Sequence, residues 1–305
     1  MSTPTPVPTA TTPVPTARPS LDQVRTRADP ELVAAGLAEE AAGRAGPATA
    51  QLREQLTGLV DRHVDRRPGV GILSGLAGLD DPAARRLTLL ASRLLGEPAG
   101  QDAAGTLLRE VRDRGLRLGE GRTGRYSDSR DGGNLHTDAP HVPGPPPDWF
   151  ALFCLRQAPV GGGLLLVHVE DVLDRLDAAA RAVLAGGFHF DRRQADARPP
   201  TVLRPVLTAG GGRTEIAYLR EYVELGHRHG HVPDLTGEQR AALDALDAAL
   251  ADESLQLTGK LDPGELAVFD NRHLCHGRTA FTDDPRPGHD RVLLRTWIRR
   301  RAPAE

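Results

Sequence analysis

The stretch Asp270-Asn-Arg-His-Leu-Cys-His276-Gly-Arg-Thr-Ala-Phe281 decides how this chain is interpreted. It follows one apolar segment, residues 265–269, and precedes another, residues 291–298, and both are typical of β-strands. Two histidines within it, His273 and His276, lie three residues apart, so on a strand they face opposite sides of the sheet. Only one of them can therefore face a given site.

A second histidine-containing segment lies far upstream, with His136 placed 140 residues before His276. In Gly132-Gly-Asn-Leu-His136-Thr-Asp138, a histidine and an aspartate are two residues apart beside a glycine-rich turn. Side chains at i and i+2 of an extended backbone point to the same face, so both can converge on one metal ion. Two histidines and one carboxylate form the facial triad of non-haem Fe(II) oxygenases. Alone, however, a His-x-Asp pattern occurs by chance in many proteins.

Taken together, these segments resemble one enzyme family. Asn-Leu-His-Thr-Asp at residues 134–138, Asp-Asn-Arg-x-x-x-His-Gly-Arg-Thr-x-Phe at 270–281 and Arg-Val-Leu-Leu-Arg at 291–295 are similar to the clavaminate synthase and taurine dioxygenase family. The resemblance runs from about residue 121 to residue 299 and includes the turn Gly161-Gly-Gly. It implies a double-stranded β-helix (jelly roll) and an enzyme that uses Fe(II), 2-oxoglutarate and O2 to hydroxylate an unactivated C–H bond.

The resemblance also implies roles for individual residues. His136, Asp138 and His276 would bind the iron. Arg291 would pair with the distal carboxylate of 2-oxoglutarate, a task that suits the planar guanidinium because it can donate two parallel hydrogen bonds. Arg295 faces the same side of a strand as Arg291, and it would either contact an acidic group of the substrate or form a salt bridge within the protein.

One position departs from the family pattern. Members commonly have Gly-Gly-x-Thr at the turn, where the Thr hydroxyl helps to hold 2-oxoglutarate, whereas this chain has Leu164. Another donor or a water molecule must then help, or the affinity for the cosubstrate is lower. Asn134, Tyr218 and Arg220 are further candidates for contacts with the substrate.

Hydroxylation is the reaction that Asp138 favours. Related halogenases have a small residue in place of this carboxylate, which leaves room for chloride. Desaturation, epoxidation and cyclisation by the same iron chemistry remain alternatives, and the substrate is expected to be a small polar metabolite, an amino acid or an amino-acid-derived natural product. Competitors from other classes are a non-catalytic jelly-roll binding or sensor module and a zinc-dependent hydrolase, although a hydrolase has no need for Arg291.

Other histidine and cysteine residues have simpler interpretations. His168-Val-Glu170 lies where an apolar strand ends and a helix begins, and Glu170 is favourable near a helix N-terminus, so we expect a structural role. The alternating histidines of residues 227–231 could bind Zn or Ni, but a flexible loop that covers the substrate explains them better. Cys154 and Cys275 are expected to be buried free thiols.

Composition excludes several classes of protein. A formal net charge of −3 and a pI near 6.4 give no indication of a nucleic-acid partner. No run of about 18 apolar residues occurs, so no membrane span is expected. Two distant cysteines and a Thr/Pro-rich start without an apolar core favour the cytoplasm over secretion. The expected partner is a small-molecule substrate, and the sequence leaves the oligomeric state open.

The chain is expected to form one oxygenase domain over residues 21–305, after a Pro/Thr-rich tail over residues 1–20. Such a tail buries too little apolar surface to offset its ordering entropy, so we expect it to be disordered. Residues 30–115 should form a helical lead-in and residues 116–300 a jelly-roll core.

Apolar residues recurring at threes and fours predict the helices of the lead-in. We expect two within residues 30–64, separated at Gly46-Pro47, a third near residues 87–95 and a fourth at 107–114. Gly69-Val-Gly-Ile-Leu is typical of a short strand between them.

Beyond residue 115, strands and polar loops predominate. The strand candidates are 149–155, 163–169, 188–190, 201–203, 215–219, 255–257, 265–269 and 291–298. Helices are expected at 171–185 and 236–252, the second beginning with a capping box of Thr236 and Gln239. Six or more strands after a helical lead-in predict an α+β protein with a mainly β core, a sandwich or jelly roll braced by helices.

Overall fold

Three helices form the N-terminal layer in the computed structural model, which describes residues 20–116, 126–194, 196–210 and 212–301. They are α1 (Pro30–Ala41), α2 (Pro47–Leu59) and α3 (Asp81–Leu95). The break between α1 and α2 is confirmed, because Pro47 occupies the first turn of α2, where its fixed φ and missing N–H are tolerated. The expected disordered tail lies, apart from its last residue, outside the described residues.

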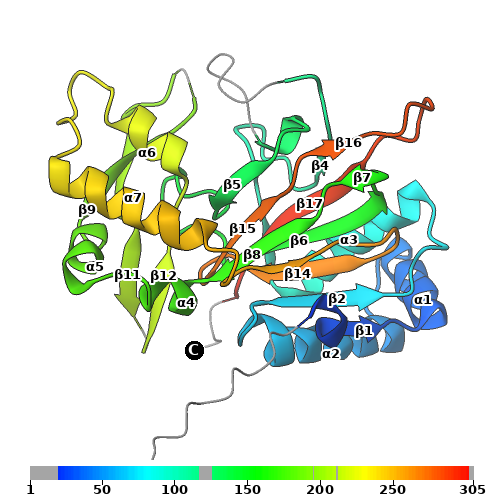
Figure 1. Cartoon of the computed structure of the whole chain (residues 1–305). Helices are drawn as coiled ribbons and strands as arrows, with labels where there is room; N and C mark the ends of the chain where they lie inside the picture. Colours follow the sequence, from blue (N-terminus) through cyan, green and yellow to red (C-terminus); the bar gives the residue numbers. More distant parts are fainter. Residues whose placement is uncertain (1–19, 117–125, 195, 211, 302–305) are drawn as a thin grey trace, which may run out of the picture.

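The larger sheet has seven strands in the order β1-β2-β14-β6-β17-β3, with β4 also paired to β17. These strands are β1 (Arg25–Arg27), β2 (Val70–Ser74), β3 (Glu97–Ala99), β4 (Arg109–Val111), β6 (Trp149–Arg156), β14 (Leu266–Asp270) and β17 (Val292–Arg299). Helices α1–α3 cover one face of this sheet (Figure 1). Their buried leucines share a hydrophobic cluster with Trp149 and Phe153.

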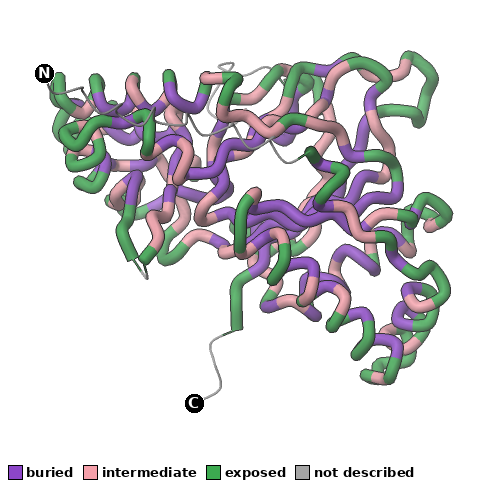
Figure 2. The backbone as a smooth tube through the Cα atoms, turned by 60° about the horizontal axis from the view of Figure 1, so that its bottom comes forward, coloured by how far each residue is buried: buried purple, intermediate pink, exposed green. Residues whose placement is uncertain are grey.

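The smaller sheet has the order β13-β8-β15-β5 and packs against the opposite face. Its strands are β5 (Gly133–His136), β8 (Leu164–His168), β13 (Leu257–Gly259) and β15 (Leu274–Arg278). Side chains from both sheets share one buried cluster, among them Phe150 and Phe269 from the larger sheet and Leu166 from the smaller one. Buried backbone is accordingly concentrated in the centre of the molecule (Figure 2). This two-sheet core, braced by helices, confirms the expected jelly-roll fold class.

An inserted unit follows β8, and its hydrophobic cluster also includes Leu135, Val167 and Cys275 of the smaller sheet. It consists of α4 (Val169–Leu173), α5 (Ala178–Leu184), β9 (Gly187–Asp191), β10 (Thr201–Pro205), β11 (Leu207–Gly210), β12 (Arg213–Ile216), α6 (Arg220–Gly226) and α7 (Gly237–Ala251). The single helix expected at 171–185 is two helices, because Asp177 accepts a hydrogen bond from Ala180 N and starts α5 anew. The capping box of Thr236 and Gln239 is confirmed.

Short elements complete the chain. They are the 3₁₀ turns η1 (Leu21–Val24) and η3 (Tyr126–Asp128), the π-helical turn η2 (Val60–Val64), and the paired strands β7 (Val160–Gly161) and β16 (Phe281–Thr282). Within the described ranges, no helix has the length and apolar character needed to cross a membrane.

The helix expected at residues 107–114 is wrong, because Arg109–Val111 form strand β4. Leu108 packs toward the helical layer and Val111 toward the space between the sheets, so apolar side chains point to both faces. Three apolar residues are too few to distinguish a helix from a strand by period. Pairing with β17, in which Leu293 lies opposite Val111, decides the conformation.

Candidate metal centre

Two strands of the smaller sheet and the residues just after one of them bring the predicted triad together. His276 in β15 lies opposite His136 at the end of β5, and their ring centroids are 4.4 Å apart. Asp138 follows two residues after His136. One possible ligand atom from each of the three residues lies within 4.8 Å of the other two. In the part of the chain that the structure describes, no other three His, Cys, Asp or Glu residues meet this condition.

The hydrogen bonds and charges of these residues fit a metal ion. His136 Nδ1 lies 2.8 Å from the carbonyl oxygen of Asn134, and donating there leaves Nε2 with its lone pair. Burial, with a smaller contribution from His136, lowers the pKa of His276 to about 3, so this imidazole is neutral at pH 7. Its Nδ1 is buried without a hydrogen-bond partner among the described residues. Two neutral imidazoles beside a carboxylate are suitable ligands for iron.

Asp138 is held in its ionised form. Burial alone would raise its pKa, but Arg295, the two imidazoles and Trp297 together lower it below the usual range. Its Oδ1 accepts a hydrogen bond from Arg295 Nη1 at 3.0 Å, and its Oδ2 accepts one from Trp297 Nε1 at 2.7 Å. Arg295 therefore forms an ion pair with Asp138, a candidate metal ligand. A salt bridge within the protein was one of the two expectations for Arg295, and a contact with the substrate was the other. Arg295 Nε also donates to Gln101 Oε1 at 2.8 Å.

One cavity of about 70 Å³ adjoins both imidazoles. Its lining includes Arg291, which is 2% exposed, and Leu164. Arg291 Nε donates to Gln157 Oε1 at 2.9 Å, whereas its Nη1 is buried without a partner, and no described carboxylate forms an ion pair with it. Burial first, and Arg278 second, lower the pKa of Arg291 to about 10. A buried guanidinium without a carboxylate partner fits an anionic ligand in this cavity.

A second cavity of about 50 Å³ lies on the Asp138 side of the centre. It shares His136, Arg295, Tyr126 and Ser127 with the first cavity. The residues that line only the second cavity of the two are Gln101, Thr137, Asp138, Ala139, Pro140, His141, Leu219, Tyr222 and Trp297. The centre thus has room on two sides, one beside a guanidinium and one with a mixed polar and aromatic lining.

Arg278 is a lining residue to which the sequence pattern assigned no role. Its guanidinium donates to the main-chain oxygens of Asp131 at 2.6 Å and Tyr126 at 2.9 Å, and also to that of Ser129. These contacts hold residues 126–131 against β15, so this segment forms a wall of both cavities. The Gly-Arg pair after His276 was visible in the sequence, but its carbonyl partners were not.

Three expected substrate contacts lie elsewhere. Tyr218 is buried and its hydroxyl donates to Asp247, while Arg220 forms ion pairs with acidic residues of α6 and α7. Neither residue lines the two cavities at the centre. Asn134 is exposed, and its contribution is the main-chain oxygen that orients His136.

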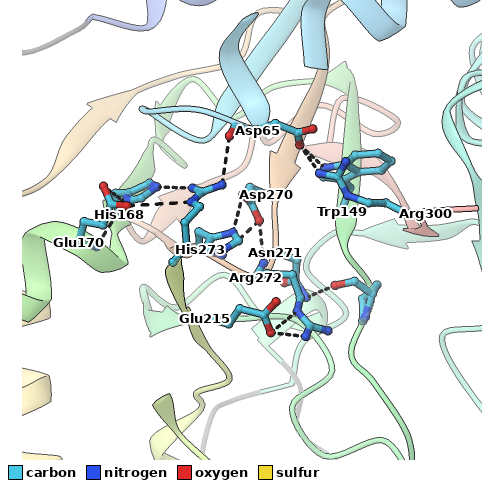
Figure 3. A network of polar contacts seen from close by, with 12 residues as sticks. Asp65, Trp149, His168, Glu170, Glu215, Asp270, Asn271, Arg272, His273 and Arg300 are labelled. Carbon is cyan, nitrogen blue, oxygen red and sulfur yellow. Dashed lines mark hydrogen bonds and ion pairs between the residues drawn. The ribbon is translucent and has the colours of Figure 1, made fainter. Parts of the chain in front are cut away.

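His168 and His227 have structural contacts. His168 caps the N-terminus of α4 by accepting from Glu170 N, which confirms the structural interpretation (Figure 3). The loop expected at residues 227–231 is anchored at its first residue. His227 is 7% exposed, its Nδ1 contacts the carbonyl oxygen of Pro233, and its Nε2 accepts a hydrogen bond from His189 N.

The two cysteines are buried and unpaired, as expected. Burial raises the pKa of Cys154 to about 12 and also raises that of Cys275. Both side chains are therefore protonated thiols at neutral pH.

Comparison with known proteins gives a consistent result. The family model described as "Taurine catabolism dioxygenase TauD, TfdA family" matches residues 32–297. FR-33289 synthase of Streptomyces rubellomurinus is 26% identical over 269 residues, which cover 84% of this chain and 74% of the synthase. L-Asparagine oxygenase of Streptomyces coelicolor is 33% identical over 161 residues, which cover 50% of this chain and 43% of the oxygenase.

Solved structures have the same fold at low sequence identity. Asparagine oxygenase in complex with Fe(II), 2S,3S-3-hydroxyasparagine and succinate is similar with a TM-score of 0.69 and 24% identity, over 90% of this chain and 93% of that chain. The non-haem iron oxygenase OrfP in complex with Fe and alpha-ketoglutaric acid has a TM-score of 0.63 and 21% identity, over 90% and 94% of the two chains.

Proposed function

We propose the function of this protein from one premise: the chain belongs to the taurine catabolism dioxygenase TauD, TfdA family. It is a non-haem dioxygenase that depends on Fe(II) and 2-oxoglutarate. Our proposal is that it hydroxylates an unactivated C–H bond of a free amino acid or a small amino-acid-derived metabolite. The observation that carries the proposal is the triad His136, Asp138 and His276 together with a buried Arg291 that forms no ion pair with a described carboxylate.

The proposed iron ligands are Nε2 of His136, a carboxylate oxygen of Asp138 and a ring nitrogen of His276. Arg291 would hold the distal carboxylate of 2-oxoglutarate in the first cavity, where no carboxylate of the described residues forms an ion pair with it. When bound, Fe(II) and 2-oxoglutarate together activate O2 for attack on a C–H bond. Leu164 provides an apolar wall here, and the lining of the same cavity includes Ser127, whose hydroxyl we propose as a replacement for that of the missing Thr.

The substrate would occupy the second cavity, on the Asp138 side. Tyr222 and His141 pack edge to face there, with centroids 4.8 Å apart, and would form an aromatic wall beside the reacting carbon. Arg295 borders both cavities, so its guanidinium can attract an acidic group of the substrate while it remains near Asp138. An amino-acid carboxylate is a suitable group, and the two named relatives include an L-asparagine oxygenase.

Hydroxylation is proposed over halogenation because the carboxylate of Asp138 is present and held ionised. Desaturation, epoxidation or cyclisation of the same substrate class are outcomes that product analysis would distinguish. A zinc hydrolase gives no reason for an unpaired buried guanidinium beside the metal centre, so Arg291 favours the oxygenase.

An anaerobic titration tests the proposal directly. Fe(II) and 2-oxoglutarate added to the protein should produce a visible charge-transfer band that shifts when the substrate binds, and a panel of amino acids and their derivatives is screened by that shift. Products of positive hits are then identified by mass spectrometry, with an expected gain of one oxygen atom and stoichiometric succinate. Absence of the band in folded protein would contradict the assignment of the centre.

Arg291→Gln tests whether Arg291 anchors the cosubstrate 2-oxoglutarate. We expect it to weaken 2-oxoglutarate binding roughly 10- to 100-fold, since a hydrogen bond to a charged group contributes about 1.5–3 kcal/mol. The ligand-free variant should be as stable as the wild type or more stable, because an unpaired buried charge is removed. Thermal unfolding with and without 2-oxoglutarate measures both effects. Equal 2-oxoglutarate affinity in the variant and the wild type would exclude Arg291 as the anchor.

A further inference from the structure

One buried amide holds the main chain of Asp138. Asn271 is 1% exposed, and its Oδ1 accepts a hydrogen bond from Asp138 N at 2.7 Å. Its Nδ2 donates to the carbonyl oxygen of Asp138 at 3.0 Å and to that of Pro147 at 2.9 Å. The side chain therefore satisfies both polar groups of the Asp138 main chain, as a neighbouring strand would do in a sheet.

Asp138 needs such a partner because it lies beyond the end of β5. The next residue, Ala139, has φ of 59°, a left-handed conformation that is unfavourable for a residue with a Cβ. A main chain in this conformation persists only where its surroundings hold it there. Asn271 supplies part of that restraint at the residue immediately before it.

The turn that carries Asn271 is held by polar contacts of its own (Figure 3). The buried carboxylate of Asp270 accepts from the main-chain N–H groups of Arg272 and His273 and contacts the His273 ring at 2.8 Å. Asn271 N donates to Asp148 O, and Asp270 N donates to Gly69 O. The amide is thus presented to Asp138 by a turn that is hydrogen-bonded to two other segments, at Asp148 and at Gly69.

We propose that Asn271 is a positioning residue that presets Asp138 for metal binding; the inference rests on the proposed function, in which Asp138 is an iron ligand. The same turn leads directly into β15, which carries His276. One segment then sets two of the three ligands: His276 through the strand, and Asp138 through the amide of Asn271. The third ligand, His136, is set by the pairing of β5 with β15.

The carboxylate retains its contacts with Arg295 and Trp297 when the amide is removed, so the centre should be loosened rather than destroyed. Asn271→Ala leaves the N–H and C=O groups of Asp138 unpaired and allows the main chain at Ala139 to relax. Loss of a group that orients a ligand typically weakens metal binding about 10- to 100-fold. We expect a loss of metal affinity in this range.

The test uses Co(II) alone as the probe, with binding followed by calorimetry and by the visible spectrum, which reports the coordination of the ion. The proteins are the wild type, Asn271→Ala, Asp138→Ala and a control, Val33→Ala. Val33 is a fully buried residue of the helical layer, so its truncation destabilises the fold away from the centre. We expect Val33→Ala to bind within about twofold of the wild type, and Asn271→Ala to bind about 10- to 100-fold more weakly with an altered spectrum.

A second measurement needs no variant and decides the matter if Asn271→Ala does not fold. Hydrogen exchange at the Asp138 amide should be slow in the metal-free wild type and change little when Co(II) is added. Fast exchange that becomes slow only with the metal would overturn the inference, because the ligand would then be ordered by the ion.

The outcomes separate the two levels of the proposal. If Asp138→Ala binds Co(II) as well as the wild type does, the proposed metal centre is wrong. If the wild type binds through Asp138 but Asn271→Ala matches it in affinity and spectrum, the centre stands and the positioning role of Asn271 is wrong.

Discussion

The same three-residue arrangement occurs twice in this structure, once at the candidate metal centre and once where strand β6 of the larger sheet begins. The inner group is Trp297, Asp138 and Arg295: the indole and the guanidinium donate to different oxygens of the carboxylate, and the guanidinium lies 5.2 Å from the centroid of the indole. The exposed fractions of the Asp138 and Arg295 side chains are 6% and 12%.

The outer group is Trp149, Asp65 and Arg300 (Figure 3). Here too the indole donates to the aspartate, at 3.1 Å, the arginine pairs with the same carboxylate, and its guanidinium lies 4.0 Å from the indole centroid. The exposed fractions are higher, 24% for the Asp65 side chain and 48% for that of Arg300.

The pairing of β6 with β17 places the two tryptophans on opposite faces of the larger sheet. Trp149 in β6 lies opposite Ile298, and Trp297 in β17 lies opposite Phe150, one position away. Because successive side chains of a strand point to opposite faces, Trp149 packs toward the helices and Trp297 toward the space between the sheets. The same three residue types therefore lie in different surroundings. The carboxylate of the inner group is buried beside two imidazoles, and that of the outer group is partly exposed to solvent.

Removal of the two carboxylates should give the largest contrast. Asp138→Ala is expected to abolish hydroxylation, because it removes a proposed metal ligand, whereas Asp65→Ala should retain full activity and lose about 1 kcal/mol of stability with its hydrogen bonds. Turnover of the identified substrate and denaturant unfolding measure the two effects. Substrate-coupled succinate formation at the wild-type rate in Asp138→Ala would remove the functional distinction between the groups.

Replacement of Arg295, the arginine of the inner group, should have the next largest effect, a loss of protein stability. Arg295→Gln leaves a buried carboxylate without its cation, so we expect the metal-free protein to lose roughly 3–5 kcal/mol of stability, the usual cost of breaking a buried pair. Bound Co(II) should restore part of this loss, because it supplies positive charge to Asp138. Unfolding in the presence and absence of Co(II) checks both statements, and equal stabilisation by Co(II) in variant and wild type would show that Arg295 and the metal do not share Asp138.

Tryptophan fluorescence can report on the inner and outer groups separately, because Trp297 and Trp149 are the only tryptophans in the sequence. Trp149→Phe leaves Trp297 as the only indole, and its emission should change when Co(II) binds, because its N–H contacts the proposed ligand. Trp297→Phe leaves only Trp149, which should report little. We also expect Trp297→Phe to weaken Co(II) binding by about 10-fold, the lower range for a group that orients a ligand. An unchanged Trp297 signal on Co(II) binding would contradict the proposed contact between ligand and indole.

The sequence predicted that His136, Asp138 and His276 lie together, which the structure shows, but it did so through motifs that resemble those of a known family. Spacing alone predicts only that His136 and Asp138 share a face, and the role of Arg291 is what the resemblance implies. The contacts that Asn271 and Trp297 make with Asp138 could not be predicted from the sequence. Asn271 is separated from Asp138 by 133 positions and Trp297 by 159, and which side chains meet depends on how the strands pair. Strand β4 was missed for a related reason, because pairing with β17 rather than local pattern sets its conformation. Tyr218 and Arg220 do not line the two cavities, and their side-chain partners include Asp247 and Asp244 on α7, which the local sequence pattern did not indicate.

Removal of the outer arginine should have the smallest effect. Arg300→Ala deletes an exposed ion pair, which contributes about 0–1 kcal/mol, and a cation–π contact at an exposed site, which contributes about 0.5–1 kcal/mol. Asp65 remains solvated and still accepts from Trp149, so no buried charge is left unpaired. We expect a loss of about 1 kcal/mol, reduced further at high salt because exposed charges are screened, with metal affinity unchanged. Denaturant unfolding at low and high salt measures this loss, and a destabilisation as large as that of Arg295→Gln would show that exposure does not distinguish the two groups.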